Sequence, residues 1–404
     1  MILSEFRDIA LSQNEALPLK ESGLERSALN ELPDIQSHAL VVCGVRRCGK
    51  STLLHQFVKK SGKKFFYFNF DDMRLNDFSV SDFALLDIVI GETGKSLLFF
   101  DEIQSVPKWE LYIRQKLDEH FQIIATGSNA SLLSGELGTK LTGRHITKEL
   151  FPFSYQEYCR FTRQKAAAES LNAYLASGGF PEYLKSGNPD ILSQLQLDIL
   201  HRDIAVRYKI RDVASLKRLF SYLLSNAAQL VSPSKLTSVI GVRSPTTILE
   251  YFSYFELSYL IHLIPRFSWS AKKQSLAPKK IYIVDLGIIH TGSVSFTNNH
   301  GALLENFVFN TIRLKTNDIF YFSTKDGECD FIVNPHSQNI LCVQVCFILT
   351  QDNRTREING LLAAMDFFDQ QKGIIVTMDS KDLIISGSRK IQVIPAWDIK
   401  EWTV

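Results

Sequence analysis

The chain lacks CxxC pairs and any large excess of charge. Its six cysteines, at positions 43, 48, 159, 329, 342 and 346, are scattered over 404 residues. That usage argues against a disulfide framework and favours reduced thiols in a cytoplasmic protein. The formal net charge is only +2, so no global field marks a nucleic-acid binder, and any basic surface must be local.

Long apolar runs are also missing. No stretch approaches the ~18 residues that a membrane-spanning helix needs. The N-terminus, MILSEFRDIAL, is acidic by its fifth residue and alternates polar with apolar, unlike a signal peptide. Hydrophobic residues make up 45% and charged residues 22% of the chain, ordinary for a soluble globular protein. At ~100–200 residues per domain, we expect two to four domains and no membrane partner.

Residues 39–54, ALVVCGVRRCGKSTLL, predict a phosphate-binding loop. An apolar strand leads into GVRRCGKS, which fits GxxxxGK[ST], and a helix follows. Glycines let backbone N–H groups curl around a phosphate, and the helix N-terminus adds its dipole. Lys50 is expected to reach the terminal phosphates of ATP, and Ser51 to bind Mg²⁺. The predicted nucleotide-binding residues are Gly44, Arg46, Arg47, Cys48, Gly49, Lys50, Ser51 and Thr52.

Two further strand ends predict the rest of an ATPase site. In LLFFDEIQ (97–104), about fifty residues after the loop, Asp101 is expected to hold the magnesium ion and Glu102 to polarise the attacking water. In FQIIATGSNA (121–130), Ser128 or Asn129 is expected to sense the γ-phosphate, unless the segment is a plain turn. Strands alternating with helices predict a parallel α/β sheet with its ligand at the strands' carboxyl ends.

At this point the chain resembles bacterial and archaeal AAA-type ATPases near the STAND and archaeal-ATPase branch of P-loop proteins. Their C-terminal half is the restriction-endonuclease-like domain of unknown function DUF4143. The resemblance spans most of the chain and rests on GVRRCGKSTLL, YFNFDD, LLFFDEIQ, ATGSNASLLS, LTGRHITKELFPFSYQEY, SGGFPEYL, RDIAVRYKIRD, GALLENFVFN and GECDFIV.

The resemblance implies two more site residues. Arg144, in LTGR, would approach the γ-phosphate, either within the chain or from a neighbouring subunit, and offset charge during phosphoryl transfer. The alternative is a solvated surface arginine. Pro181, in SGGFPEYL, would pack on the adenine, although Gly-Gly-Phe-Pro would equally end a helix.

The middle of the chain predicts helices over 151–225 and a winged helix over 226–290. In 230–264 a helix, a turn at Gly241 and a longer helix are followed by strands flanking a basic loop. The second helix, ILEYFSYFELSYL, has acids and five aromatics, so that face is expected to bind protein. The loop at 266–280 could instead contact DNA or RNA phosphates, or simply be solvated; its basic residues are Arg266, Lys272, Lys273, Lys279 and Lys280.

From 301 the order helix, three strands, helix, strand predicts a nuclease-like core. Glu305 and Asp330 stand where active members carry metal-binding acids. Gln344 replaces the second strand acid and is a weaker ligand, while Cys346 replaces the lysine and cannot carry its charge. Lys325 is a candidate substitute for that lysine. We therefore expect the fold to persist with feeble cleavage or none, so these residues are a nuclease-like remnant.

Together these patterns predict four domains: a P-loop AAA-type ATPase domain (1–150), a helical lid (151–225), a winged-helix-like domain (226–290) and a restriction-endonuclease-like domain (291–404). The predicted function is ATP binding and hydrolysis with Mg²⁺, coupled to the C-terminal domains, with a homo-oligomer as a candidate assembly. The alternatives are a slow ATP-controlled switch or scaffold that binds protein or nucleic acid, and an ATP-dependent nuclease of a defence or repair system.

Overall fold

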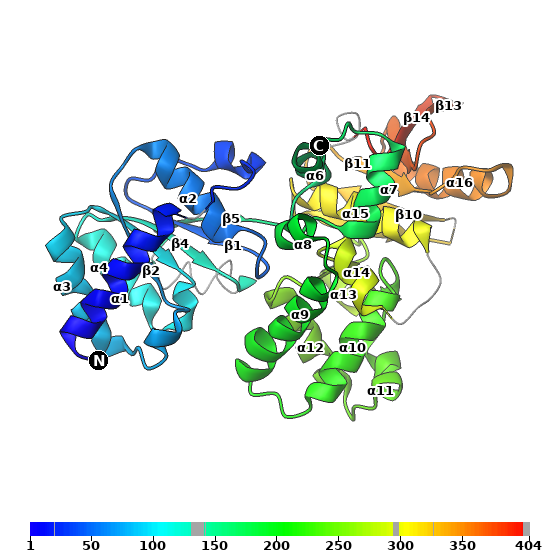
Figure 1. The fold of residues 1–404 in the computed structure, drawn as a ribbon. Coiled ribbons are helices and arrows are strands. Elements are labelled where there is room, and N and C mark those ends of the chain that lie inside the picture. The colour runs from blue at the N-terminus through cyan, green and yellow to red at the C-terminus, as the bar shows by residue number, and fades with distance from the viewer. Residues whose placement is uncertain (20, 131–140, 142, 294–298, 326, 399–404) are drawn as a thin grey trace. The chain divides into compact units, whose positions relative to one another are not determined.

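The computed structural model describes residues 1–19, 21–130, 141, 143–293, 299–325 and 327–398. It contains two compact units, residues 1–151 with 257–259, and residues 152–256 with 260–404 (Figure 1). The predicted ATPase domain (1–150) lies in the first unit. The other three predicted domains lie in the second, apart from residues 151 and 257–259. No helix in the described part of the chain is both long and apolar enough to cross a bilayer.

The first unit is built on the predicted parallel sheet. Its strands are β1 (Ala39–Cys43), β2 (Phe65–Asn69), β3 (Leu97–Asp101), β4 (Gln122–Gly127) and β5 (His145–Glu149). They lie in the order β2-β3-β4-β1-β5, and every pairing is parallel. Strand β4 therefore lies between the strand that precedes the phosphate loop and the strand that ends at Asp101. The carboxyl ends of these three strands share one edge.

Helices cover this sheet. They are α1 (Leu3–Ala16), α2 (Lys50–Ser61), α3 (Phe83–Thr93) and α4 (Trp109–Asp118), with short 3₁₀ turns η1 (Leu17–Leu19), η2 (Ser27–Glu31), η3 (Met73–Leu75), η4 (Val80–Asp82) and η5 (Ile103–Ser105). Helix α1 shields the edge strand β2 with its side-chain amides. Asn14 bonds both N–H and C=O of Tyr67, and Gln13 does the same for Asn69. An exposed strand edge can pair with another chain, and these amides cover it.

The second unit begins with helices, as predicted. These are α6 (Tyr155–Thr162), α7 (Ala168–Ser177), α8 (Pro181–Ser186), α9 (Asp190–Asp198), a π-helix (Ile199–Val206) and α10 (Val213–Ser225). The SGG of SGGFPEYL allows a close approach between α7 and Asp285. Gly179 N–H donates to Asp285 Oδ2 at 2.6 Å, and a Cβ on Gly178 would lie 2.2 Å from Oδ1. A Cβ on Gly179 would lie 2.1 Å from the carbonyl oxygen of Phe153, so packing requires both glycines.

A small sheet follows, with helices between its strands. The elements are β6 (Leu230–Val231), α11 (Pro233–Ile240), α12 (Pro245–Leu257), β7 (Ile261–Ile264), α13 (Ala271–Leu276) and β8 (Lys279–Ile283), and the antiparallel strand order is β6-β8-β7. The expected partner-binding aromatic face of α12 is corrected. Tyr251, Phe252 and Phe255 are buried, and Tyr254 stacks on Tyr208 with ring centroids 4.0 Å apart. Those aromatics form core rather than a docking surface.

The last part is a further α/β region, as predicted. After α14 (Leu286–Gly292) come α15 (His300–Arg313), β9 (Ile319–Ser323), β10 (Glu328–Val333), β11 (Leu341–Val345), α16 (Gln351–Phe367) and β12 (Lys372–Thr377). A hairpin that the sequence analysis did not identify, β13 (Asp382–Ser386) and β14 (Arg389–Pro395), extends the sheet to the order β13-β14-β12-β11-β10-β9. Helix α16 packs its apolar face on this sheet, with Leu361, Ala364 and Met365 buried.

Candidate functional site

The phosphate loop connects β1 to α2, and its backbone takes conformations that favour glycine. Gly44 and Gly49 have φ of +155° and +101°, and Arg47 has φ of +63°. A Cβ on Gly44 would lie 2.0 Å from the carbonyl oxygen of Leu150. Positive φ and close backbone approach are what glycine permits. The loop ends at the N-terminus of α2, where backbone N–H groups have no helical partners and favour an anion.

Lys50 opens α2 and folds its side chain back over the loop. Its ammonium donates to the carbonyl oxygens of Gly44 at 3.0 Å and Val45 at 3.2 Å, and lies 3.6 Å from Glu102 Oε1. Burial acts to lower the pKa of Lys50, but the nearby carboxylates of Glu102 and Asp101 outweigh it and raise that pKa. Lys50 is therefore cationic, and two of its bonds go to neutral acceptors.

Asp101, at the end of β3, accepts hydrogen bonds from side chains on β2, β4 and α2. Ser51 Oγ donates to Oδ1 at 2.9 Å, Tyr67 Oη donates to Oδ2 at 2.9 Å, and the Thr126 hydroxyl also bonds Oδ1. Burial and the charge of Glu102 raise the pKa of Asp101, while these three hydrogen bonds oppose the rise. Ser51 and Asp101, the two predicted magnesium ligands, thus lie in direct contact. Hydroxyl and carboxylate oxygens are the donor types that Mg²⁺ prefers.

Glu102 follows directly, in the left-handed region at φ +52°, with its N–H bonded to Thr126 Oγ1 at 2.9 Å. Burial alone would raise the pKa of Glu102, but the Lys50 ammonium and a hydrogen bond from Gln104 bring it below its usual value. Gln104 Nε2 also donates to Ser128 Oγ at 3.3 Å. Ser128 and its neighbour Asn129 are both buried just beyond β4. Gln104, which the sequence analysis did not select, bridges the predicted base and the predicted sensor.

Arg26 is a second residue that carried no sequence signal. Its guanidinium is buried and donates to the carbonyl oxygens of Cys48 and Phe151, each at 2.8 Å. The backbone N–H of Arg26 donates to the side-chain oxygen of Gln56 on α2. Arg26 therefore ties the segment before β1 to the phosphate loop and to the helix behind it. No motif surrounds it, since its partners are backbone carbonyls that only the fold brings together.

The remaining loop residues have different surroundings. Arg46 forms an ion pair with Asp71 at 3.1 Å, and Arg47 is exposed. Cys48 is fully buried, with its Sγ bonded to the carbonyl oxygen of Leu150 at 3.3 Å, so its side chain supports the loop from the core side. Thr52 is half-buried on the first turn of α2. Residues 131–134 of the ATGSNASLLS motif lie outside the described residues.

Arg144 does not join this constellation. Arg144 precedes β5 at the amino edge of the sheet, where its carbonyl oxygen accepts from Ala39 N–H and its guanidinium pairs with Asp118 at 2.7 Å. The phosphate loop leaves the other end of β1, four residue steps of about 3.3 Å away. Pro181 belongs to the second unit, where it is the first residue of α8.

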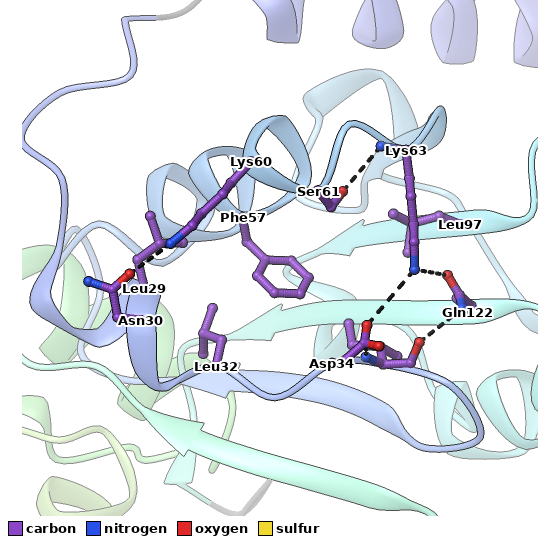
Figure 2. A pocket seen from close by; sticks show the side chains of 11 residues that line it. Leu29, Asn30, Leu32, Asp34, Phe57, Lys60, Ser61, Lys63, Leu97 and Gln122 are labelled. Carbon is purple, nitrogen blue, oxygen red and sulfur yellow. Dashed lines mark hydrogen bonds and ion pairs between the residues drawn. The ribbon is translucent and has the colours of Figure 1, made fainter.

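The first unit also has a cavity at the amino edge of its sheet (Figure 2). It measures about 430 Å³, with Phe57 on one wall and Lys60 and Lys63 at the rim. Figure 2 shows Lys60 reaching Asn30 and Lys63 reaching Gln122, at 2.7 and 3.1 Å. Because Leu97 and Gln122 begin their strands, this cavity lies at the edge opposite Asp101 and Ser128. It is separate from the phosphate loop.

Known protein families and relatives match most of the chain. A family model described as an AAA domain matches residues 36–159, and a domain of unknown function, DUF8612, matches residues 168–297. The uncharacterized protein MJ1544 of Methanocaldococcus jannaschii is 32% identical over 398 residues, covering 91% of this chain and 89% of the relative. An uncharacterized protein of Haemophilus influenzae is 30% identical over 358 residues, covering 83% of this chain and 88% of the relative.

The chain belongs to the same family as these two proteins. Its N-terminal part is an AAA domain of the ATP-binding P-loop class. Two solved structures are more distant. AMPPCP-bound DnaA from Aquifex aeolicus is 18% identical, with a TM-score of 0.27 over 57% of this chain and 84% of that one. A chain of Drosophila ORC bound to AT-rich DNA and Cdc6 is 12% identical, with a TM-score of 0.20 over 71% and 90%. Neither likeness supports a conclusion about this chain.

Beyond the AAA domain, the structure places the predicted nuclease-like acids around a lysine that the sequence had assigned to the basic loop. Lys280 Nζ, on β8, lies 2.7 Å from Asp330 Oδ1, 2.8 Å from Glu305 Oε1 and 3.3 Å from Glu328 Oε1. Burial acts to lower the pKa of Lys280, but Asp330 and Glu305 raise it well above its usual value. Burial and the charge of Asp330 raise the pKa of Glu305 to about 7.

Gln344 and Cys346 also have surroundings of their own. Gln344 Oε1 accepts from Asp330 N–H at 3.1 Å, and Gln344 Nε2 donates to Glu357 Oε2 at 2.6 Å. Glu357, a buried acid on α16 that the sequence did not single out, also accepts from Arg356. Cys346 is buried, and burial raises its pKa to about 11. A cavity of about 610 Å³ adjoins the cluster and is lined by Asp330, Gln344, Glu357 and exposed Lys325.

The predicted basic loop at 266–280 is corrected in one respect. Lys280 is 5% exposed and bonded to carboxylates, so it cannot meet a nucleic-acid phosphate. Arg266 and Lys279 are only partly exposed, and the backbone of Arg266 pairs with Tyr321 of β9. Lys272 and Lys273, on α13, are exposed. The basic surface available here is therefore smaller than the sequence predicted.

Proposed function

We propose that the AAA domain hydrolyses ATP with Mg²⁺ and that its nucleotide state controls the C-terminal half of the chain. The observation that carries this proposal is the contact between Ser51 and Asp101 beside Lys50 and Glu102. It joins a metal-binding hydroxyl, a carboxylate, a cation and a second carboxylate at one sheet edge. A chance loop with the same sequence would have no reason to meet all of these groups.

In this proposal Ser51 and Asp101 would hold the magnesium ion, which would supply positive charge to offset that of the phosphates. The backbone N–H groups of the loop and the Lys50 ammonium bind the phosphates. Lys50 would exchange its carbonyl partners, Gly44 and Val45, for phosphate oxygens. Glu102 remains ionised because its pKa is lowered, and it orients the attacking water.

In this proposal Gln104 links recognition of the γ-phosphate at Ser128 to the position of Glu102. It donates to both Glu102 and Ser128. A γ-phosphate that accepts from Ser128 would alter the position of Gln104 and so release or reorient Glu102. Hydrolysis would then depend on the correct nucleotide being in place.

The test is Glu102→Gln. We expect ATP to bind as in the parent, because the loop and Lys50 are intact, while the hydrolysis rate falls by ~10²–10⁴, the usual cost of losing a general-base contact. Glu31→Gln, an exposed acid on η2, is the matched control and should change neither quantity. Parental turnover by Glu102→Gln would reject the assignment.

A second candidate is a slow ATP-controlled switch whose turnover waits for an arginine from another subunit. The placement of Arg144 at the edge opposite the phosphate loop favours it, because Arg144 cannot then serve the site of its own chain. An arginine supplied in trans is worth ~10³–10⁵ in kcat where it has been measured.

Mixing two inactive chains tests the trans arrangement. A chain with Arg144→Ala keeps a complete phosphate loop, and a chain with Lys50→Ala keeps the arginine. We expect activity to return on mixing, and the wild-type rate per subunit to rise with protein concentration. If mixing restores nothing and the wild-type rate is independent of concentration, Arg144 has no role in trans.

For the C-terminal half we propose a winged-helix-like domain followed by a nuclease-like fold of the DUF4143 kind. The orders β6-α11-α12-β7-α13-β8 and α15-β9-β10-β11-α16-β12 support these assignments. Lys272 and Lys273 are the candidate nucleic-acid contacts. A contact through phosphates alone would be insensitive to sequence and would weaken steeply with salt.

A further inference from the structure

The carboxylate cluster of the C-terminal half has two of the acids expected of a nuclease-like metal site, Glu305 and Asp330, and the question is whether they can hold a divalent cation. A metal at this place would have to draw oxygen atoms from Glu305 and Asp330. Those are the two side chains that Lys280 contacts most closely, at 2.8 and 2.7 Å. Lys280 comes from β8, outside the nuclease-like order of elements.

We infer that the ammonium of Lys280 takes the place of the divalent cation, so that the cluster is an internal ion clasp between β8, α15 and β10 rather than a metal-dependent catalytic centre. A lysine ammonium has three N–H donors. Asp330, Glu305 and Glu328 are three carboxylates within 3.3 Å of it. Each donor therefore has an acceptor, and the positive charge lies where a bridging metal would lie.

The oxygens of the cluster also have further partners. Asp330 Oδ2 accepts from Val345 N–H at 2.9 Å, and Glu305 Oε1 accepts from Tyr282 Oη at 2.7 Å. Gln344 Oε1 accepts from the N–H of Asp330, and Glu357 accepts from Gln344 and Arg356. A divalent cation needs several free oxygen atoms converging at one point. Here the Lys280 ammonium contacts one oxygen of each of the three acids, so the residues do not fit a metal while that ammonium is in place.

The clasp also explains the two departures from the nuclease pattern. A site that needs no second metal-binding acid can carry Gln344, whose amide donates to Glu357 and accepts from Asp330 at once, which a carboxylate cannot do. A site that already has a cation can carry Cys346 in place of a lysine. The hydrogen bonds of the Cys346 thiol go to the Ile348 carbonyl oxygen and the Asn353 side-chain amide rather than to the acids.

The test is a Mn²⁺ titration of the full-length, nucleotide-free protein, followed by the loss of the free-ion paramagnetic resonance signal. Wild type, Lys280→Met and each of these combined with Asp330→Asn are compared, because Asp330→Asn leaves the magnesium ligands of the AAA domain unchanged. Only binding that disappears with Asp330→Asn is attributed to the cluster. Lys272→Met, an exposed lysine on α13, is the matched control.

We expect wild type and Lys272→Met to bind no Mn²⁺ that depends on Asp330. Lys280→Met should gain one such site, with a dissociation constant of roughly 0.1–1 mM, as in weak oxygen-ligand sites. Wild-type binding that depends on Asp330 would overturn the inference, as would a folded Lys280→Met that gains no site. If Lys280→Met does not fold, the wild-type titration still decides. So does incubation of wild type with plasmid DNA and Mn²⁺, where cleavage that disappears in Asp330→Asn would contradict the clasp.

Discussion

The phosphate loop and the carboxylate cluster contain the same residue types, but the lysine has different hydrogen-bond partners in each. Each has a buried lysine next to two acids: Lys50 beside Glu102 and Asp101, and Lys280 beside Glu305 and Asp330. Lys50 donates to two backbone carbonyls and lies 3.6 Å from its nearest carboxylate. Lys280 lies within 2.8 Å of two carboxylates.

That difference decides what each lysine can do. A neutral carbonyl is a replaceable partner, so Lys50 can turn to a phosphate and gain a charge-assisted bond. Leaving two carboxylates would cost Lys280 most of its electrostatic stabilisation, because buried charges are expensive without partners. Composition alone does not distinguish a ligand-binding lysine from a structural one; the charge of its present partners does.

The largest expected effect is on the stability of the clasp. Lys280→Met leaves buried acids unpaired and should lower the free energy of unfolding by roughly 3–5 kcal/mol. Neutralising the acids as well, with Glu305→Gln and Asp330→Asn, should recover most of the loss, since uncharged replacements of a whole buried ion cluster are often tolerated. Urea denaturation of wild type, Lys280→Met and the triple variant measures the free energy of unfolding of each. A triple variant no more stable than Lys280→Met would mean that unpaired charge is not the cause.

Arg26 tests how far the phosphate loop depends on support from outside its motif. Arg26→Met removes charged donors from the carbonyls of Cys48 and Phe151, at ~1–3 kcal/mol for each buried group left unsatisfied. We expect ATP affinity to weaken about tenfold, or ~1.4 kcal/mol, because the loop carbonyl loses its anchor. Fluorescent-ATP titration is the measurement. Arg7→Met, which breaks an exposed pair with Glu92, should leave affinity unchanged, and equal effects of the two variants would refute the anchoring role.

Thr126 should have a smaller effect at the same site. Its hydroxyl bonds both the carboxylate of Asp101 and the N–H of Glu102, so Thr126→Val should cost ~1–3 kcal/mol in unfolding free energy and reduce kcat. Thr147→Val on strand β5 is the matched control, because the buried Thr147 hydroxyl has no hydrogen-bond partner among the described residues. Thermal unfolding and steady-state turnover of both variants decide. Equal losses would show that the hydroxyl of Thr126 has no special role.

The smallest expected effect concerns Lys272 and Lys273. Replacing both by Gln should reduce the salt dependence of DNA binding by ~0.9 in the log–log slope for each lysine–phosphate ion pair removed. The control replaces Lys59 and Lys64, two exposed lysines of the first unit, by Gln. Binding measured by fluorescence anisotropy across salt concentrations gives the slopes. An unchanged slope in the Lys272 and Lys273 variant would assign those lysines to solvent.

The sequence was sufficient for the parallel sheet and for the contact of Ser51 with Asp101, because strand-end motifs of a parallel sheet meet at one edge whatever the loops do. It was insufficient for Arg26, Gln104 and Glu357, because no sequence pattern marks the partners that the fold brings to them. Lys280 was misassigned for a related reason. The segment KIYIV, which begins with Lys280, predicts a strand, but burial of Lys280 against α15 and β10 depends on tertiary packing that local sequence does not encode.

The most direct test of the contrast between the two lysines compares the variants Lys50→Met and Lys280→Met. Each variant is measured for its affinity for fluorescent ATP and for its unfolding by urea. We predict that Lys50→Met weakens ATP binding by at least ~100-fold, ~2.7 kcal/mol, with little loss of stability, and that Lys280→Met does the reverse. Parental ATP affinity in Lys50→Met, or a parental unfolding midpoint in Lys280→Met, would contradict the account.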